Sequence, residues 1–269
     1  MSNFAELVRN ISYEVMPLRG TEDAVLADVP ADVPLTVTVT ESKGLDATLE
    51  LSERLHGHGY AVAPHLAARQ FADARHVEDV VARLREAGLR SVVVVGGDAP
   101  RPAGPFPDAF TLLQTMEALG HPFDRIGVGG YPEGHATIPR DALDLALKQK
   151  APLATHVISQ ICFSAATTSS WAAGVVGLPV YVGLPGPVNR QRLVRISANI
   201  GLGRSARFVR KQRGLLWRLL LPRGYRPTPL VRRLGARAPA NVAGLHIFTF
   251  NELRRTEAWR QRLLATVTS

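Results

Sequence analysis

The chain contains one cysteine, Cys162, among its 269 residues. A lone cysteine excludes a disulfide within the chain and a zinc site built from cysteines. No apolar run is long enough to cross a bilayer, and the N-terminus shows no charged-then-apolar leader. We therefore expect a soluble, cytoplasmic protein with no metal centre and no membrane partner.

Nucleotide- and nucleic-acid-binding signatures are also absent. No predicted turn carries a GxGxxG fingerprint, and residues 96–100, Gly-Gly-Asp-Ala-Pro, lack its spacing. Zinc-finger spacing and an RNP-type aromatic strand are missing, so the net charge of +9 does not favour nucleic acid as a partner. A small polyanion, such as a dinucleotide or a polycarboxylate, would account for the charge equally well. So would a basic surface without a specific partner.

Much of the positive charge lies between Arg190 and Arg237, a stretch predicted to form an extended basic helical segment with breaks at glycines and prolines. Most of these arginines are interpreted as a solvated helical face. Residues 214–221 are apolar among arginines and could also form a membrane-surface or partner helix. An outer helix of a barrel needs the same apolar stripe for its own core.

Eight strand-like segments recur along the chain, and helical spacing of apolar residues follows most of them. The predicted strands are residues 11–17, 34–40, 60–64, 91–95, 125–129, 156–161, 179–183 and 245–250. The predicted helices are residues 45–55, 77–87, 108–119, 139–150, a small-residue helix around Trp171, the broken segment 190–237, and residues 252–264. This alternation predicts a single-domain (β/α)8 TIM-type barrel over residues 1–269, with an open doubly wound sheet as the competing α/β fold.

Residues 127–135, Gly-Val-Gly-Gly-Tyr-Pro-Glu-Gly-His, close an apolar strand and place a tyrosine, a carboxylate and a histidine within five positions. The glycines allow close approach of backbone or ligand, and Pro132 ends the strand. The stretch is therefore interpreted as the entrance of a ligand-binding site. A turn with a capping histidine uses the same residue types and is the alternative.

Other polar residues also fall at or just past the carboxyl ends of predicted strands, the face on which barrels build active sites. These residues are Thr40, His65, Asp98, Tyr131, Gln160 and Asn251.

Glu14 interrupts the first buried strand. An unpaired carboxylate in apolar surroundings tends to hold a proton, which suits a general acid. Alternatively, Glu14 points to solvent from an edge strand, because strand alternation sends half the residues outward.

Several short motifs, taken in order, resemble the methylenetetrahydrofolate reductase family over nearly the whole chain. They are residues 12–14 (SYE), 64–66 (PHL), 96–98 (GGD), 130–135 (GYPEGH), 159–160 (SQ) and 244–251 (GLHIFTFN). The family is a (β/α)8 barrel that reduces 5,10-methylenetetrahydrofolate to 5-methyltetrahydrofolate, usually passing a hydride from a nicotinamide through bound FAD.

The resemblance implies a role for each matching residue. Glu14 matches the general acid that assists opening of the imidazolidine ring to an iminium able to accept hydride. The implied substrate-binding residues are Asp98, Gln160, Phe163 and Leu184. The implied cofactor-binding residues are Thr40, His65, Tyr131, His135 and Lys150.

The sequence departs from the family pattern where the family holds FAD. The family has an aromatic residue and a glycine-rich turn after the second strand, whereas here Thr40 precedes residues 41–44, Glu-Ser-Lys-Gly. Where the family has an Asp and an Asn for the FAD ribose and phosphates, this chain has Leu143 and Ala146, although a basic cluster remains at residues 148–150. Losing such anchors costs on the order of several kcal/mol of binding.

These departures suggest that FAD is not a prosthetic group and that NADH or NADPH occupies the flavin's place and reduces the folate directly. This arrangement resembles the flavin-independent branch of the family found in mycobacteria. The expected partners are a tetrahydrofolate substrate, a nicotinamide dinucleotide and, by analogy, a second copy of the chain in a dimer. The alternatives are an FAD-dependent ping-pong reductase, and a non-catalytic barrel whose basic arm binds nucleic acid or a membrane surface.

Overall fold

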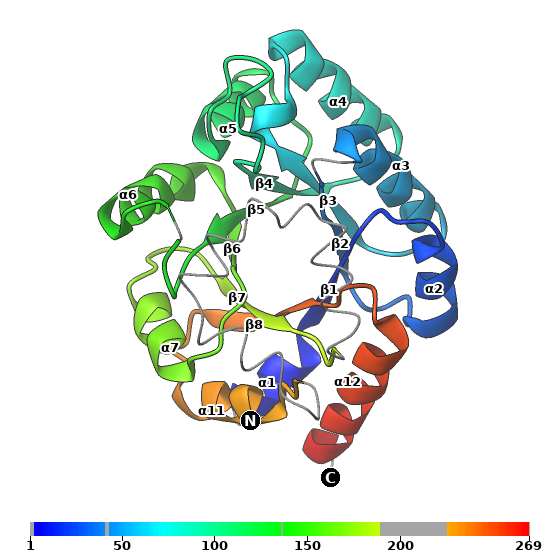
Figure 1. Ribbon diagram of the computed structural model, residues 1–269, viewed down its shortest axis with the longest axis vertical. Coiled ribbons are helices and arrows are strands. Elements are labelled where there is room, and N and C mark those ends of the chain that lie inside the picture. The colour runs from blue at the N-terminus through cyan, green and yellow to red at the C-terminus, as the bar shows by residue number, and fades with distance from the viewer. Residues whose placement is uncertain (1–2, 41–42, 136, 189–224, 269) are drawn as a thin grey trace.

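The computed structural model describes residues 3–40, 43–135, 137–188 and 225–268. Within these residues eight parallel strands close into a barrel in the order β1 to β8, with β8 pairing back to β1. Figure 1 shows the strands as a ring with the helices around its outside. The predicted (β/α)8 barrel is therefore confirmed. No helix in the described ranges is long and apolar enough to cross a membrane.

The eight strands have three to seven residues each. They are β1 (Ile11–Val15), β2 (Leu35–Val37), β3 (Val62–Ala67), β4 (Ser91–Val95), β5 (Arg125–Gly130), β6 (His156–Ser159), β7 (Val180–Pro185) and β8 (Val242–Phe248).

The described helices are α1 (Asn3–Arg9), α2 (Thr21–Asp28), α3 (Gly44–Gly57), α4 (Ala74–Glu86), α5 (Ala109–Ala118), α6 (Arg140–Lys150), α7 (Ala165–Ala173), α11 (Thr228–Arg237) and α12 (Leu253–Thr268), with 3₁₀ turns η1 (Ala68–Gln70) and η2 (Ala151–Leu153).

Strand alternation divides the polar and apolar residues of the barrel. In β1, Ile11, Tyr13 and Val15 are buried, while Ser12 and Glu14 are only partly buried. The buried set belongs to one apolar cluster that also contains strand and helix residues from around the barrel. The other set faces the barrel interior, where Ser12 contacts His246 on β8 and Glu14 contacts His65 on β3. The core therefore lies between sheet and helices, and the interior is free to hold polar groups.

The outward side of β1 is fixed by a buried polar cluster. The Tyr13 hydroxyl donates to Oε2 of Glu257 in α12 at 2.7 Å. Arg260 donates to both oxygens of the same carboxylate, at 2.9 and 3.0 Å, and Gln261 donates at 2.6 Å. A buried carboxylate with this many donors is stable without water, so β1 is held in register against the last helix.

Several predicted element boundaries were wrong. β3 extends through Ala67 because His65, Leu66 and Ala67 all pair with β4, so His65 lies within the strand and not at its end. β6 ends at Ser159, so Gln160 follows the strand. Helices α1 and α2 were missed. Within α2 only Thr21 and Val25 are buried, which leaves little apolar periodicity for a sequence pattern to detect.

The basic segment predicted at 190–237 is described only in part. Its last ten residues form α11, which begins after Pro227 and buries Leu230, Val231 and Leu234 against the barrel. The apolar stretch 214–221, interpreted either as an outer barrel helix or as a membrane-surface or partner helix, is not among the described residues. Residues 189–224 lie outside the described residues.

Gly183 in β7 marks a very close backbone approach near the strand ends. A Cβ at this position would lie 2.2 Å from the Ser159 carbonyl oxygen and 2.8 Å from that of Gln160. We predict that Gly183→Ala lowers the free energy of unfolding by about 3 kcal/mol in denaturant titrations, because backbone atoms must move to admit the methyl group.

Gly57→Ala is the matched control for this substitution. Gly57 is the last residue of α3 and does not adopt a positive φ, and no described atom lies within 4 Å of the place that an added methyl group would take. Alanine there is expected to be neutral or stabilising by up to about 1 kcal/mol. Equal stability of the two variants would contradict the predicted clash.

Candidate active site

Glu14 lies at the centre of a polar group inside the barrel. Its Oε2 is 3.7 Å from Nε2 of His65 on β3 and 3.7 Å from Nε2 of His246 on β8. The Glu14 side chain is 14% exposed, and that of His246 is fully buried. Glu14 thus points into the barrel, which contradicts the alternative of a solvent-facing edge residue. Two imidazoles flank the carboxylate, both at 3.7 Å and so beyond hydrogen-bond distance.

Two hydroxyl groups, one on β1 and one on β2, orient the His246 ring. Its Nδ1 lies 2.9 Å from the Ser12 hydroxyl, and its Nε2 lies 3.5 Å from the Thr36 hydroxyl. Phe248 packs edge-on against the ring at 5.3 Å. The ring that faces Glu14 is therefore fixed by contacts on three strands.

Burial keeps two interior histidines neutral. It lowers the pKa of His65 to about 4, with the nearby Glu14 opposing the shift and His246 adding to it. Burial likewise lowers the pKa of His156 on β6 to about 4, helped by Arg125 and His246. At neutral pH the imidazoles of His65 and His156 are therefore uncharged.

The 127–135 stretch forms the end of β5 and the loop after it. The rings of Tyr131 and His135 meet edge to face at 5.3 Å. Burial and the charge of Asp98 raise the pKa of Tyr131, whereas burial lowers that of His135 against the pull of Asp98. The three predicted residues therefore come together across the ends of β4 and β5. Asp98 itself is exposed.

His135 also caps its own turn, as the alternative interpretation predicted. Its Nδ1 accepts hydrogen bonds from the N–H groups of Thr137 and Ile138, both at 3.3 Å. An accepting Nδ1 places the proton of the neutral ring on Nε2. Nδ1 of His135 thus stabilises the turn, and Nε2–H is left as a hydrogen-bond donor.

Gln160 and Phe163 lie together in the loop between β6 and α7. Gln160 is exposed, and its N–H donates to the Gly130 carbonyl at 2.8 Å. Phe163 is 7% exposed and packs in a small cluster with Val188 and, at its margin, Tyr225 and other apolar residues. This loop borders the Tyr131 loop, so the predicted substrate and cofactor residues occupy adjacent strand ends.

Three of the residues singled out from the sequence are buried in the barrel or stabilise the backbone, and do not face the predicted site. Leu184 is fully buried in the main apolar core, because it alternates with Gly183 and faces the helices, so it offers a substrate no surface. Lys150 is buried, and its ammonium donates to the Gly129 carbonyl at 3.2 Å. Asn251 bonds both the N–H and the carbonyl of Met16, which ties the end of β8 to the loop after β1.

A comparison with known families adds an independent observation. The family model described as methylenetetrahydrofolate reductase matches residues 7–180, well over half of the chain. The chain belongs to the methylenetetrahydrofolate reductase family. Membership supports the assignment of the chain as an oxidoreductase that acts on methylenetetrahydrofolate in folate one-carbon metabolism.

Solved structures that resemble this reductase share the barrel alone. Oxaloacetate acetylhydrolase with the inhibitor 3,3-difluorooxalacetate aligns with a TM-score of 0.54 at 9% identity, covering 98% of this chain and 82% of that one. A putative phosphonomutase from Burkholderia cenocepacia J2315 gives 0.54 at 13% identity, covering 98% and 96%. The C-terminal domain of a putative chitinase from Desulfitobacterium hafniense DCB-2 gives 0.53 at 11%, covering 97% and 99%. At such identities only the fold is transferred.

The residues where reductases of this family hold FAD do not fit that cofactor here. Leu143 is buried and Ala146 has no polar side-chain atom, so neither can bind a ribose or a phosphate. The Lys150 ammonium is engaged by a backbone carbonyl, and burial lowers its pKa to about 8. By contrast, the Thr40 hydroxyl is buried with no hydrogen-bond partner among the described residues. An unsatisfied buried hydroxyl at a strand end is available to a smaller ligand.

Sequence reasoning overlooked several polar residues of this reductase. Ser12, Thr36, His156 and His246 face the barrel interior, but each has an apolar or aromatic neighbour on either side or at a strand start and forms no recognisable motif by itself. A histidine inside an apolar β-branched run was the signal that could have found His246. Glu133 was quoted within a motif and given no role.

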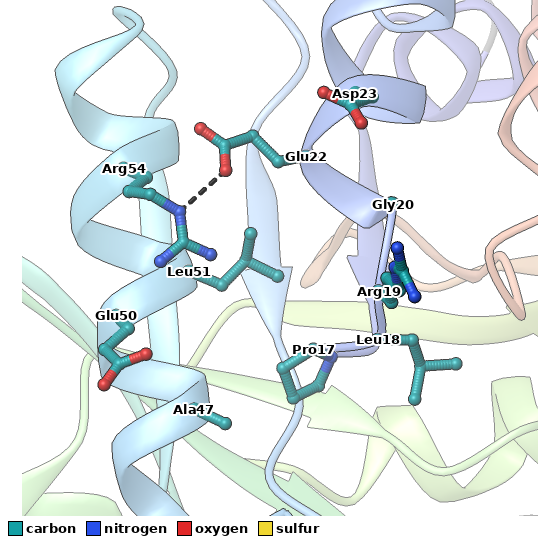
Figure 2. Close-up of a pocket in the computed structure, with 10 residues that line it drawn as sticks. All are labelled: Pro17, Leu18, Arg19, Gly20, Glu22, Asp23, Ala47, Glu50, Leu51 and Arg54. Carbon is teal, nitrogen blue, oxygen red and sulfur yellow. Dashed lines mark hydrogen bonds and ion pairs between the residues drawn. The ribbon is translucent and has the colours of Figure 1, made fainter.

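The structure also shows a hollow outside the predicted site. It has a volume of about 270 Å³ and lies between the loop after β1, the start of α2 and the face of α3 (Figure 2). Arg54 crosses it to Glu22 at 2.7 Å. None of its lining residues belongs to the predicted site. In the described part of the chain, no three His, Cys, Asp or Glu side chains are grouped to hold a metal ion.

We predict an acid-sensitive stability from His65 and His156. Their folded pKa of about 4 lies below the ordinary value of 6.5, so between these values the unfolded chain binds more protons. The stabilisation is complete above pH 6.5 and is lost as pH falls toward 4, by about 3 kcal/mol per histidine. Denaturant titrations across this pH range would measure it.

His156→Gln should remove about half of this pH dependence, since one of the two titrating groups is gone. His58→Gln is the control, because His58 is exposed on the C-terminal side of α3. An unchanged pH slope in His156→Gln would contradict the assignment.

Proposed function

We propose that the chain reduces 5,10-methylenetetrahydrofolate to 5-methyltetrahydrofolate by direct hydride transfer from NADH or NADPH, with Glu14 as general acid and without a flavin. The observation that carries the catalytic part is the placement of Glu14 inside the barrel, flanked by His65 and His246. Family membership supports the substrate.

Glu14 has the chemistry that ring opening requires. A proton delivered to the departing nitrogen of the imidazolidine ring breaks its bond to the bridging carbon and leaves an iminium that accepts hydride. The carboxylate that remains is flanked by imidazoles able to donate hydrogen bonds, so the negative charge does not stand alone in the barrel. In this proposal His246, held by Ser12 and Thr36, keeps the carboxyl group in one orientation.

The strand-end residues would orient the two reactants. Gln160, beside the Phe163 cluster, presents an exposed amide for the pterin, whose ring carries donors and acceptors in one plane. Tyr131 and His135 form an aromatic corner suited to a flat nicotinamide. Because both sets border the same mouth, a ternary complex brings donor and acceptor together without covalent chemistry by the protein.

The proposal of a flavin-independent reaction rests on the residues that replace the FAD anchors. Leu143 is buried and Ala146 is apolar, whereas an adenine dinucleotide held permanently needs polar partners for its buried groups. Thr40, with its buried hydroxyl, and His135, with Nε2–H, remain as contacts for a dissociable nicotinamide dinucleotide.

We predict that the purified protein lacks the absorbance of a flavin and oxidises NADH when methylenetetrahydrofolate is added without FAD. An absorbance spectrum and an NADH assay in the same cuvette measure both properties. Turnover only after adding FAD would support an FAD-dependent reductase with weakened binding. No turnover in either condition would favour the alternative of a non-catalytic barrel whose basic segment, residues 190–237, binds nucleic acid or a membrane surface.

Glu14→Gln should lower kcat by about 10²- to 10⁴-fold, the usual contribution of a positioned acid, while folate binding changes little. The amide keeps the shape and cannot release the proton. Glu78→Gln, an exposed position on α4, is the control and should retain full activity. A Glu14→Gln enzyme with undiminished kcat would exclude Glu14 as the acid.

A further inference from the structure

Glu133 is the one charged residue of the 130–135 motif for which the proposed function has no use, and it makes two short hydrogen bonds. Its Oε1 accepts from the N–H of Phe163 and from the N–H of Ser164, both at 2.7 Å. These donors belong to the loop between β6 and α7, about thirty residues further along the chain. A charge-assisted bond of this length is among the stronger ones in proteins.

The loop that Glu133 contacts has no regular secondary structure, yet its backbone is held at several points. The Gln160 N–H donates to Gly130 and the Cys162 N–H to Gly183, both at 2.8 Å. The Ser159 hydroxyl accepts from the Gly183 N–H at 2.8 Å. With the two bonds to Glu133, four N–H groups between residues 160 and 164 have fixed partners.

The sulfur of Cys162 reinforces the same loop. Burial raises the pKa of Cys162 to about 11, with Glu133 among the minor causes, so the thiol stays protonated. Its Sγ donates to the Gln160 carbonyl at 3.0 Å. Among the described hydrogen bonds to this loop, those of Glu133 are the ones made by a carboxylate. They hold the N–H groups of Phe163 and Ser164, at the end of the loop next to α7.

Glu133 also has a favourable electrostatic position. Ser164 is the N-cap of α7, and its hydroxyl accepts from the Thr167 N–H at 3.2 Å. The Glu133 carboxylate lies at the same helix end, where the helix dipole favours negative charge. The dipole and the two N–H groups thus hold the carboxylate in place.

We propose that Glu133 is a positioning residue that orders the folate-contacting stretch at residues 160–163 from the neighbouring β5–α6 loop, a role that rests on the proposed function. Tyr131 and His135 border one reactant, Gln160 and Phe163 border the other, and Glu133 connects the two loops. The pterin-facing amide of Gln160 and the Phe163 wall then exist before the folate arrives, which reduces the entropy lost on binding.

Glu133→Ala should raise the KM for methylenetetrahydrofolate about tenfold or more, because both anchoring bonds are lost. The KM for NADH should change by less than about twofold, since the Tyr131 turn keeps its own bonds from Gly134 and Arg140. Glu133→Gln retains an acceptor oxygen at the same reach and should restore most of the folate affinity. If Glu133→Ala does not fold, Glu133→Asp replaces it as the test variant, because the shorter side chain draws the carboxylate away from both N–H groups.

Ser164→Ala separates positioning from helix stability. It removes the Ser164–Thr167 cap and leaves both bonds to Glu133 in place. We expect its folate KM to stay within about twofold of the unsubstituted protein. Equal increases in Ser164→Ala and Glu133→Ala, or no increase in Glu133→Ala, would overturn the proposal.

Amide hydrogen exchange over residues 160–166 tests the loop without turnover. Faster exchange in Glu133→Ala than in Ser164→Ala supports the anchoring, and unchanged exchange overturns it. Calorimetric binding of 5-methyltetrahydrofolate to the unsubstituted protein then distinguishes the two hypotheses. A protein that binds no folate overturns the proposed function and the folate role of the loop, whereas binding with an unchanged Glu133→Ala affinity overturns only the role of Glu133.

Discussion

Every second side chain of a strand in a closed parallel barrel must point toward the barrel axis, and the polar chemistry of this protein depends on that constraint. Ser12 and Glu14 share the inward face of β1 because Tyr13 between them faces α12. The same alternation brings His65 from β3 and His246 from β8 to within 3.7 Å of the Glu14 carboxylate. Polar residues that lie far apart in the sequence therefore meet in one group.

The outward face of the same strand keeps that group in place. The Tyr13–Glu257 bond, reinforced by Arg260, attaches β1 to the last helix, and the buried polar atoms satisfy one another. A shift of β1 by one residue would put Glu14 in the apolar layer and Tyr13 in the barrel. Packing between sheet and helices thus determines the register on which the candidate acid depends.

Above the interior group, neighbouring loops support each other through backbone bonds. Gly183 lets β7 approach the Ser159 carbonyl, Cys162 bonds Gly183, and Glu133 accepts two N–H groups of the next loop. Rigid loops of this kind would suit the proposed ternary complex, in which two flat reactants are oriented with no covalent step on the protein. Where the family holds FAD, Leu143 and the inward-turned Lys150 instead extend the packing of the barrel wall.

The barrel and most of its strand-end residues could be predicted from the amino-acid pattern, because β-branched runs alternating with helical periodicity leave few other folds. This pattern placed Asp98, Tyr131 and His135 near one another correctly, since strand order alone brings consecutive strand ends together. It also singled out Glu14, a charge in an apolar strand. Periodicity is a local signal, however, and it missed α2, whose buried residues are too few to form a stripe.

Which side each residue faces, and which residues it contacts there, depends on long-range packing. His65 and His246 are paired with Glu14 by closure of the barrel, a long-range contact that no local pattern encodes. Leu184 and Lys150 are buried by packing that depends on neighbouring strands and helices. Glu133 is matched to Phe163 and Ser164 by the meeting of two loops, for which spacing along the chain gives no indication.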